Sequence, residues 1–363
     1  MKFENVIAFS EQSKDLAEAM KEFAREVLNE RKGLKSFEKH SREDMNKLIN
    51  KAFSIELGKL TGSEVPTAKN DIARYVTRTN VTEFANETRD VLIDMILPDV
   101  LMDSSLNYLA DIKYADFGDS IKFEIPSQQL LTVSKAGYRK RRTDVQKTYR
   151  NDITMTGTNH QISVSTNLFD ILIGKSYLAE EIMKSALAIE TALAFDIYDA
   201  FTASANALTG SLAVANYSAD SLVHLCQVVE SYNMGAKPVI IGTELALSKV
   251  LPSDTQWRYF LDSEYVKLGR LQEFRGYNVI PMKQIANPYD PTDEYALKLD
   301  DTKIYVVSPA SDKIVKVGIF GGTMSHQNDP YDNANLSVIN TINETFEVQT
   351  VTASVAGVVK SLS

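Results

Sequence analysis

The residues best able to carry chemistry in this chain do not combine into a recognisable site. Gly174-Lys175-Ser176 resembles the end of a phosphate-binding loop that opens a helix. That motif needs another glycine five residues before Gly174, and the chain has Phe169 at this position. The glycine-rich stretch 318–322 lacks the dinucleotide-binding spacing and precedes no predicted helix, so it is interpreted as a flexible loop. The sequence therefore predicts no nucleotide site at either place.

Metal-binding and nucleophilic side chains are equally dispersed. His40, His160, His224 and His326 fall on different predicted elements, and no pair has the spacing of metal ligands. Cys226 is the single cysteine, which excludes an internal disulfide, and its apolar helical surroundings predict a buried, inert thiol. There is no Gly-x-Ser-x-Gly motif, and neighbouring acidic residues usually mark a solvated face. The sequence thus predicts no catalytic residue, no metal site and no cofactor.

The composition indicates a large folded protein without a membrane segment. The chain has 363 residues, of which 44% are hydrophobic, so it can bury an extensive core. Its net charge of −9 argues against a dedicated nucleic-acid-binding protein, because the phosphate backbone selects basic surfaces. No apolar run is long enough to span a membrane, and the first residues do not read as a secretion signal. A cytoplasm-like compartment is predicted.

The strongest charge feature is a polar, basic segment at 134–151, between two predicted strands. Its cations are Lys135, Arg139, Lys140, Arg141, Arg142, Lys147 and Arg150. These side chains, here called the basic tip, could contact nucleic acid, dock on an acidic surface of another copy of this chain, or lie in a solvated loop. The acidic balance of the chain favours docking on another copy.

The strands that flank the basic tip form a predicted hairpin. Ile121, Phe123 and Ile125 alternate with polar residues, and a second β-rich stretch returns over 153–164. A strand pair of this length should reach about 40 Å from its root. Because an isolated two-stranded hairpin is marginal in water, it requires a partner surface.

A long helix is predicted from Ser176, its expected N-cap, to Ser204. At about 1.5 Å per residue it would be roughly 40 Å long, so we call it the spine. No proline or glycine interrupts it, and one apolar stripe runs along its length. The stripe consists of Leu178, Ile182, Ala186, Ile189, Leu193, Ile197 and Phe201.

The remaining segments are assigned around the spine and hairpin. Two charged helices with narrow apolar stripes are predicted within 11–60, the second with Leu48 in its stripe and capped by Ser41. The stretch 61–80 is read as a linker, followed by a helix over 82–97 that Pro98 ends. An alternation of helices and strands from 210 to 325 predicts a compact α/β lobe, with strands that include 295–299 and 303–307. Threonine- and valine-rich β structure is predicted for 336–360.

This order of parts resembles the major capsid protein of tailed bacteriophages, which has the HK97-like fold of α+β class. The resemblance covers about residues 76–363 and includes LGRLQEFRGYNVIPM at 268–282 and NETFEVQTVTASVAGVVK at 343–360. The implied division is an N-terminal helical arm (1–75), a lead into the peripheral domain (76–118), an extended β-hairpin loop (119–166), the spine of the peripheral domain (167–209), an axial domain (210–325) and return strands of the peripheral domain (326–363).

The resemblance implies a structural protein, not an enzyme, that self-assembles into the icosahedral head enclosing double-stranded DNA. Implied partners are copies of itself in hexamers and pentamers, portal, scaffolding or decoration proteins, and packaged DNA contacted non-specifically. The implied location is the virion, after assembly in the host bacterial cytoplasm. The helices within 11–60 would be either a short form of the scaffolding region that many members lose or a retained arm. No cross-linking lysine or its acceptor can be matched here.

Two other readings remain. An encapsulin-like shell has the same fold but encloses a protein cargo. A cytoplasmic α/β enzyme would use the 210–325 lobe and would need a polar pocket with a strongly shifted ionisable group.

Overall fold

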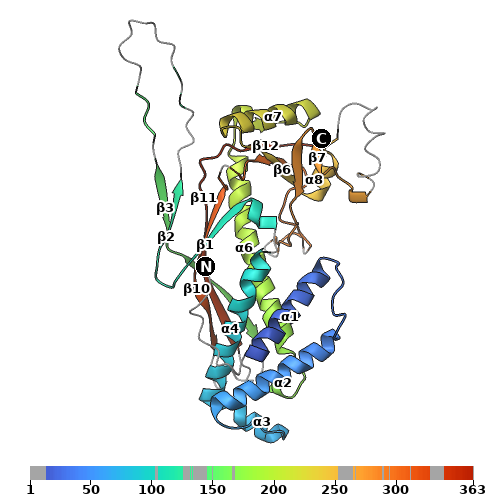
Figure 1. The fold of residues 1–363 in the computed structure, drawn as a ribbon, viewed down its shortest axis with the longest axis vertical. Helices are drawn as coiled ribbons and strands as arrows, with labels where there is room; N and C mark the ends of the chain where they lie inside the picture. Colours follow the sequence, from blue (N-terminus) through green and yellow to red (C-terminus); the bar gives the residue numbers. More distant parts are fainter. Residues whose placement is uncertain are drawn as a thin grey trace.

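The structure is a computed structural model with mixed helices and strands, so its class is α+β as predicted. It describes residues 14–102, 105–125, 131, 133, 145–148, 150–165, 168–251, 265, 267–287, 290–293, 295–310, 312–327 and 339–362. The molecule is elongated, with the N-terminal helices at one end and a six-stranded sheet at the other (Figure 1). No helix in the described ranges is long and apolar enough to cross a membrane.

The N-terminal region forms four helices, which are α1 (Lys14–Arg31), α2 (Arg42–Thr61), α3 (Lys69–Val76) and α4 (Thr79–Met102). The side chain of Ser41 caps α2 by accepting a hydrogen bond from the Asp44 amide. Leu48, predicted to lie in the buried stripe, is exposed, because the buried face of α2 runs through Met45, Ile49, Phe53 and Leu57. The buried residues of these helices belong to the same core as the spine.

Two predictions for this region are wrong. The supposed linker 61–80 contains α3, whose Ile72, Tyr75 and Val76 are buried at helical spacing. Helix α4 also continues past Pro98 to Met102. Proline removes one backbone hydrogen bond from a helix, and the burial of Ile96 and Leu97 just before it offsets this loss.

The spine is α6 (Leu178–Asn206), preceded by the short α5 (Leu168–Leu172). It begins and ends two residues later in the chain than predicted, and all seven residues of the stripe are buried. Ser176 is not the N-cap, because Tyr177 occupies that position without a side-chain cap bond. Instead, Asn50 of α2 accepts a hydrogen bond from the Leu178 amide at 3.0 Å.

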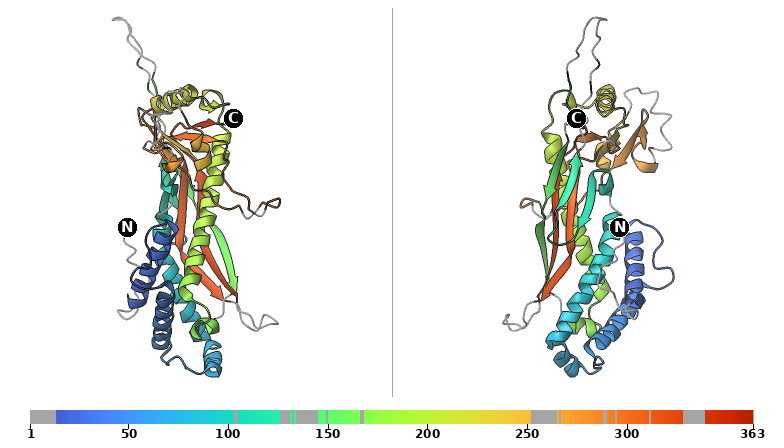
Figure 2. Two further views of the ribbon diagram at one scale, coloured as in Figure 1. Left: turned by 90° about the vertical axis from the view of Figure 1, so that its right-hand side faces the viewer. Right: turned by 60° about the vertical axis from the view of Figure 1, so that its left-hand side comes forward.

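A four-stranded sheet lies beside the spine in the order β1-β10-β11-β4 (Figure 2). Its strands are β1 (Ala110–Ala115), β4 (Thr158–Ser165), β10 (Val315–Gln327) and β11 (Ile339–Thr350). Strand β1 is parallel to β10, and the other two pairs are antiparallel. The predicted flexible loop at 318–322 is wrong, because these residues lie inside β10 and lead into an irregularity between Phe320 and Met324.

The predicted hairpin begins with β2 (Ile121–Ile125) paired to β3 (Asn151–Met155). The second β-rich stretch is two strands, since β4 starts at Thr158 and pairs with β11 instead of β2. Gly157 lies between β3 and β4 with φ of 86°, a conformation that favours glycine. The predicted reach of about 40 Å falls mostly on residues outside the described ranges.

The second sheet has six strands in the order β5-β12-β9-β6-β8-β7. They are β5 (Ala213–Val214), β6 (Val239–Gly242), β7 (Glu273–Phe274), β8 (Tyr277–Pro281), β9 (Ile304–Val307) and β12 (Gly357–Val359). Helices α7 (Ala219–Tyr232) and α8 (Glu244–Ser248) pack on it around a separate core. Short 3-10 turns, η1 (Ser105–Tyr108) and η2 (Gly210–Leu212), precede β1 and β5. The predicted strand at 295–299 is wrong in its described residues, where a single bridge joins Leu297 to Ala286.

Sheet membership differs from the predicted division at two places. The boundary at 325 falls within β10, which belongs to the four-stranded sheet. Strand β12 pairs with β5 and β9, so the end of the chain returns to the six-stranded sheet. The division into domains otherwise stays a prediction.

Candidate subunit-contact surface

Most of the basic tip lies outside the described residues. This applies to Lys135, Arg139, Lys140, Arg141 and Arg142. The described members are Lys147 and Arg150, and both are exposed. The guanidinium of Arg150 lies 3.5 Å from the Glu124 carboxylate, and both side chains are more than 70% exposed, so this pair adds little stability.

The root of the hairpin is fixed by a small core of its own. Ile121, Phe123 and Met155 are buried together with Phe320 of β10. The Lys113 ammonium lies 4.3 Å from the centre of the Phe123 ring and donates a hydrogen bond to the Lys122 carbonyl at 2.9 Å. The described root of the hairpin, β2 and β3, is therefore held by β1 and β10.

The connection between the hairpin and the sheet is held by one carboxylate. Glu347 of β11 accepts hydrogen bonds from the amides of Thr156 and Gly157, both at 2.9 Å. Burial opposes the charged form of Glu347, but these bonds and one from Gln349 hold its pKa below the usual value. A Cβ at Gly157 would lie 2.7 Å from a methyl group of Thr345, so glycine is required by space as well as by φ.

Polar contacts join the spine to the elements at its two ends. At its start, Glu180 accepts hydrogen bonds from Arg42 and Asn46 of α2. Near its end, the hydroxyl of Tyr198 donates to the Lys283 carbonyl at 3.2 Å, and Phe201 packs against Tyr305 of β9. The spine therefore connects the helical end of the molecule to the six-stranded sheet.

Two carboxyl groups, the half-buried Asp94 and the buried Glu344, lie where α4 meets the irregular part of β10. The Thr323 amide donates to Asp94 at 2.8 Å, and the Thr323 hydroxyl donates to Glu344 of β11 at 3.0 Å. Burial, reinforced by the Asp94 charge, raises the pKa of Glu344 to about 7, although the Thr323 bond acts in the opposite direction. Burial also raises the pKa of Asp94. This pair could not be predicted from the sequence, because residues 94, 323 and 344 are distant in the chain.

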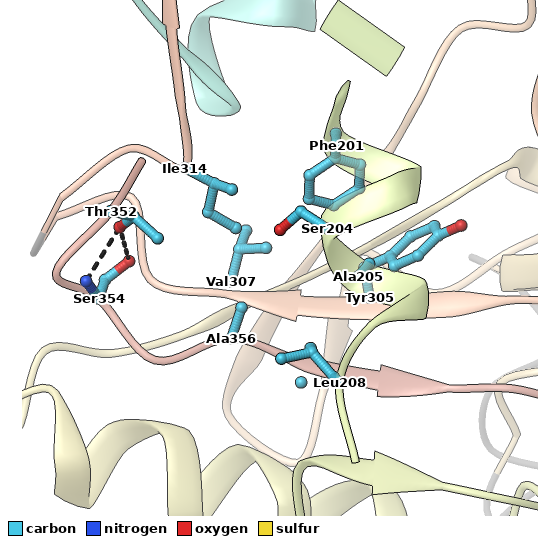
Figure 3. Close-up of a pocket in the computed structure, with 11 residues that line it drawn as sticks. Phe201, Ser204, Ala205, Leu208, Tyr305, Val307, Ile314, Thr352, Ser354 and Ala356 are labelled. Carbon is cyan, nitrogen blue, oxygen red and sulfur yellow. Dashed lines mark hydrogen bonds between the residues drawn. The ribbon is translucent and has the colours of Figure 1, made fainter. Parts of the chain in front are cut away.

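A small cavity lies between the end of the spine and the six-stranded sheet (Figure 3). Its volume is about 70 Å³, and Phe201, Leu208, Val307 and Ile314 supply much of an apolar wall. The hydroxyls of Thr352 and Ser354 bond to each other at 2.8 Å. This volume suits a few water molecules and is too small for an organic cofactor.

The other chemical candidates are placed apart. Cys226 is buried in the core of the six-stranded sheet, and burial raises its pKa to about 12, so the thiol is unreactive as predicted. The imidazole of His160 stacks on Phe346 and lies 3.3 Å from Asp196. Within the described residues, no three His, Cys, Asp or Glu side chains form a group that could hold a metal ion.

Residues 16–360 match the model of a family described as SPbeta prophage-derived putative capsid protein YonB. The chain belongs to this family. The match covers nearly the whole sequence, so the resemblance to a phage capsid protein is confirmed. No curated protein matches at a significant level.

Several solved shell proteins are similar to the chain at low identity. The capsid of a native GTA particle has 13% identity and a TM-score of 0.49, over 71% of this chain and 90% of that one. The mature capsid of bacteriophage PhiM1 has 13% identity and a TM-score of 0.43, over 71% and 86%. A virus-like particle from Pyrococcus furiosus has 11% identity and a TM-score of 0.44, over 74% and 97%. These scores are low, and the assignment to a family rests on the family model alone.

Proposed function

We propose that this chain is the major capsid protein of a tailed phage and forms the icosahedral shell around its double-stranded DNA. The observation that carries the proposal is the match of residues 16–360 to a capsid-protein family. The description of that family points to a structural role and to a place in the virion. Assembly would occur in the cytoplasm of the host bacterium.

The contrast between a packed core and exposed apolar residues in the hairpin segment supports this role. The body of the subunit is well packed, whereas the hairpin leaves Val133 97% exposed and Val145 88% exposed. Apolar side chains this exposed favour contact with a partner surface. In a ring of identical subunits, the hairpin would lie across a neighbour, and the basic tip would bind an acidic surface there.

In this proposal the spine keeps the two ends of the subunit at a fixed separation. The six-stranded sheet would pack near the five- and six-fold axes of pentamers and hexamers. Portal, scaffolding or decoration proteins would bind the finished or growing shell, and the DNA would be contacted without sequence specificity. An encapsulin-like compartment is less well supported, because the matching family is described as a capsid protein of prophage origin.

The experiment is to purify the full chain and follow its size by light scattering and negative-stain electron microscopy across protein and salt concentrations. We expect capsomers or closed shells, because the exposed Val133 and Val145 favour contact with a neighbouring subunit. A single species of about 40 kDa, from the chain mass of 40.5 kDa, under every condition would contradict the proposal. Shells that package a host protein instead of DNA during phage growth would favour the compartment.

A further inference from the structure

In the described residues, the two larger sheets have four outer strands between them, and three of these are poorly suited to pair with another chain. In the six-stranded sheet the outer strands β5 and β7 have two residues each. In the four-stranded sheet the outer strand β1 carries Asp111 and Lys113. Short strands and charged side chains are the usual means by which proteins prevent pairing at sheet edges.

The fourth outer strand, β4, lacks these protections. It has eight residues, Thr158 to Ser165, and contains no proline, glycine, lysine, arginine or acidic residue. Within the part of the chain that the structure describes, β4 pairs only with β11, and no other strand covers its outer edge. Figure 2 shows this green strand at the margin of the sheet.

Strand β4 is also held in an extended conformation before any partner arrives. His160 stacks on Phe346 at a ring distance of 3.6 Å, and Ile162 pairs with the buried Ile342. The Ser163 hydroxyl lies 3.1 Å from that of Thr341. Because the strand is already ordered, pairing at its outer edge would cost little conformational entropy.

We propose that the outer edge of β4 pairs with an extended strand of a second copy of this chain. The inference rests on the proposed shell function, which brings identical subunits together. Two copies with a net charge of −9 repel each other, and an uncharged strand is the place where backbones can approach without opposing like charges.

The size of the edge also fits a contact between shell subunits. Eight residues extend about 26 Å and offer the backbone groups of about four residues on the outer side. Such an area is too small to hold a dimer by itself. In a closed shell the same contact repeats with every subunit and adds to those of the hairpin.

The experiment compares the full-length wild type with an edge variant, Gln161→Lys/Ser163→Lys, whose changes lie at exposed positions of β4. Thr67→Lys/Asn70→Lys, beside and within α3, is the matched control, because it adds the same charge at exposed polar residues outside both sheets. Assembly is measured by light scattering and electron microscopy. Hydrogen–deuterium exchange of amides 158–165 is measured in wild-type subunits and in wild-type particles.

We expect loss of complete particles for the edge variant, wild-type assembly for the control, and slower exchange of β4 amides in particles. Particles from the edge variant at wild-type yield, or equal exchange rates in both states, would overturn the inference and leave the shell function intact. If the edge variant does not fold, the exchange rates of the wild type decide. If the wild type never assembles, the proposed function fails and the edge pairing fails with it.

Discussion

Glu344 is the residue whose chemistry depends most on its surroundings. It is 4% exposed, lies near Asp94 and shares Thr323 with it, and no basic side chain contributes to its shifted pKa. Other ionisable groups on this side of the sheet include Tyr114 of β1, whose pKa is raised by burial and by Glu344, and His160, directly opposite on β4 and 3.3 Å from Asp196. A carboxyl in this position is favoured in its neutral form.

This burial makes the stability of the subunit depend on pH in a defined direction. The pKa of Glu344 is about 7 in the folded chain and near 4.5 in the unfolded chain, so the folded chain binds more protons between these values. Its stabilising contribution is full below about pH 4.5 and is lost as the pH rises through 7. Each unit of pKa shift corresponds to about 1.4 kcal/mol. We therefore expect the wild type to lose stability relative to Glu344→Gln between pH 5 and pH 8 in urea unfolding of the subunit.

Glu347→Gln is the matched control on the same strand. The pKa of Glu347 is lowered in the folded chain, so its carboxylate stays charged throughout this pH interval. Its contribution to the free energy of unfolding is lost only when the pH falls below the usual carboxyl pKa. The difference between wild type and this control should stay constant from pH 5 to pH 8. A constant difference for Glu344→Gln over the same interval would show that its carboxyl is ionised throughout.

The glycines at 318–322, near Asp94 and Glu344, explain why this part of β10 was predicted as a flexible loop. A Cβ on Gly322 would lie 2.6 Å from an Asp94 oxygen, and one on Gly318 would lie 3.0 Å from the Phe320 ring. Both glycines are crowded by side chains, from Phe320 and Ile121 at Gly318 and from Asp94 of α4 at Gly322. A run of glycines is the usual signal of a flexible loop, and nothing local distinguishes it from a strand crowded by its neighbours.

At the scale of elements, the sequence predicted best where the signal is local and long. The spine repeats apolar residues at spacings of three and four over 29 residues, and its position was predicted to within two residues. The Asn50 cap, the helix α3 and the passage of α4 through Pro98 depend on packing between distant segments, so they could not be predicted. Helix propensity is a weak guide where tertiary contacts decide.

The spine should tolerate no charge on its buried stripe. Ile189→Asp would place a carboxylate without a partner in the core and cost several kcal/mol of folding free energy. Lys184→Ala is the control, because Lys184 is exposed on the same helix. Thermal unfolding of the purified subunits measures both changes. If Ile189→Asp melts and assembles like the wild type, Ile189 is not part of a core that stabilises the subunit.

At the scale of the whole molecule, two features in the described part of 119–166 lack a partner inside the subunit. The first is the pair of exposed side chains Val133 and Val145, and the second is the outer edge of β4, which pairs with no described strand. The sequence predicted that the hairpin needs a partner surface. It could not predict the open edge of β4, because this requires knowing which strand is outermost in the sheet. Sheet order is a property of the fold, because it depends on pairings between residues far apart in the chain.

The basic tip provides the test that separates folding from assembly. Arg141→Glu/Arg142→Glu reverses two charges in a polar segment, so circular dichroism and thermal unfolding of the subunit should match those of the wild type. If the tip binds an acidic surface of a neighbour, attraction becomes repulsion. Each exposed pair contributes only about 0.2–1 kcal/mol, but symmetry repeats the change in every subunit. The variant should therefore fail to form complete particles by electron microscopy, and high salt should weaken assembly of the wild type through screening.

Lys21→Glu/Arg25→Glu, at exposed positions of α1, makes the same change in charge and should assemble normally. Normal shells that lose their DNA would instead assign the tip to the genome, and normal shells with normal DNA content would leave the tip without either role.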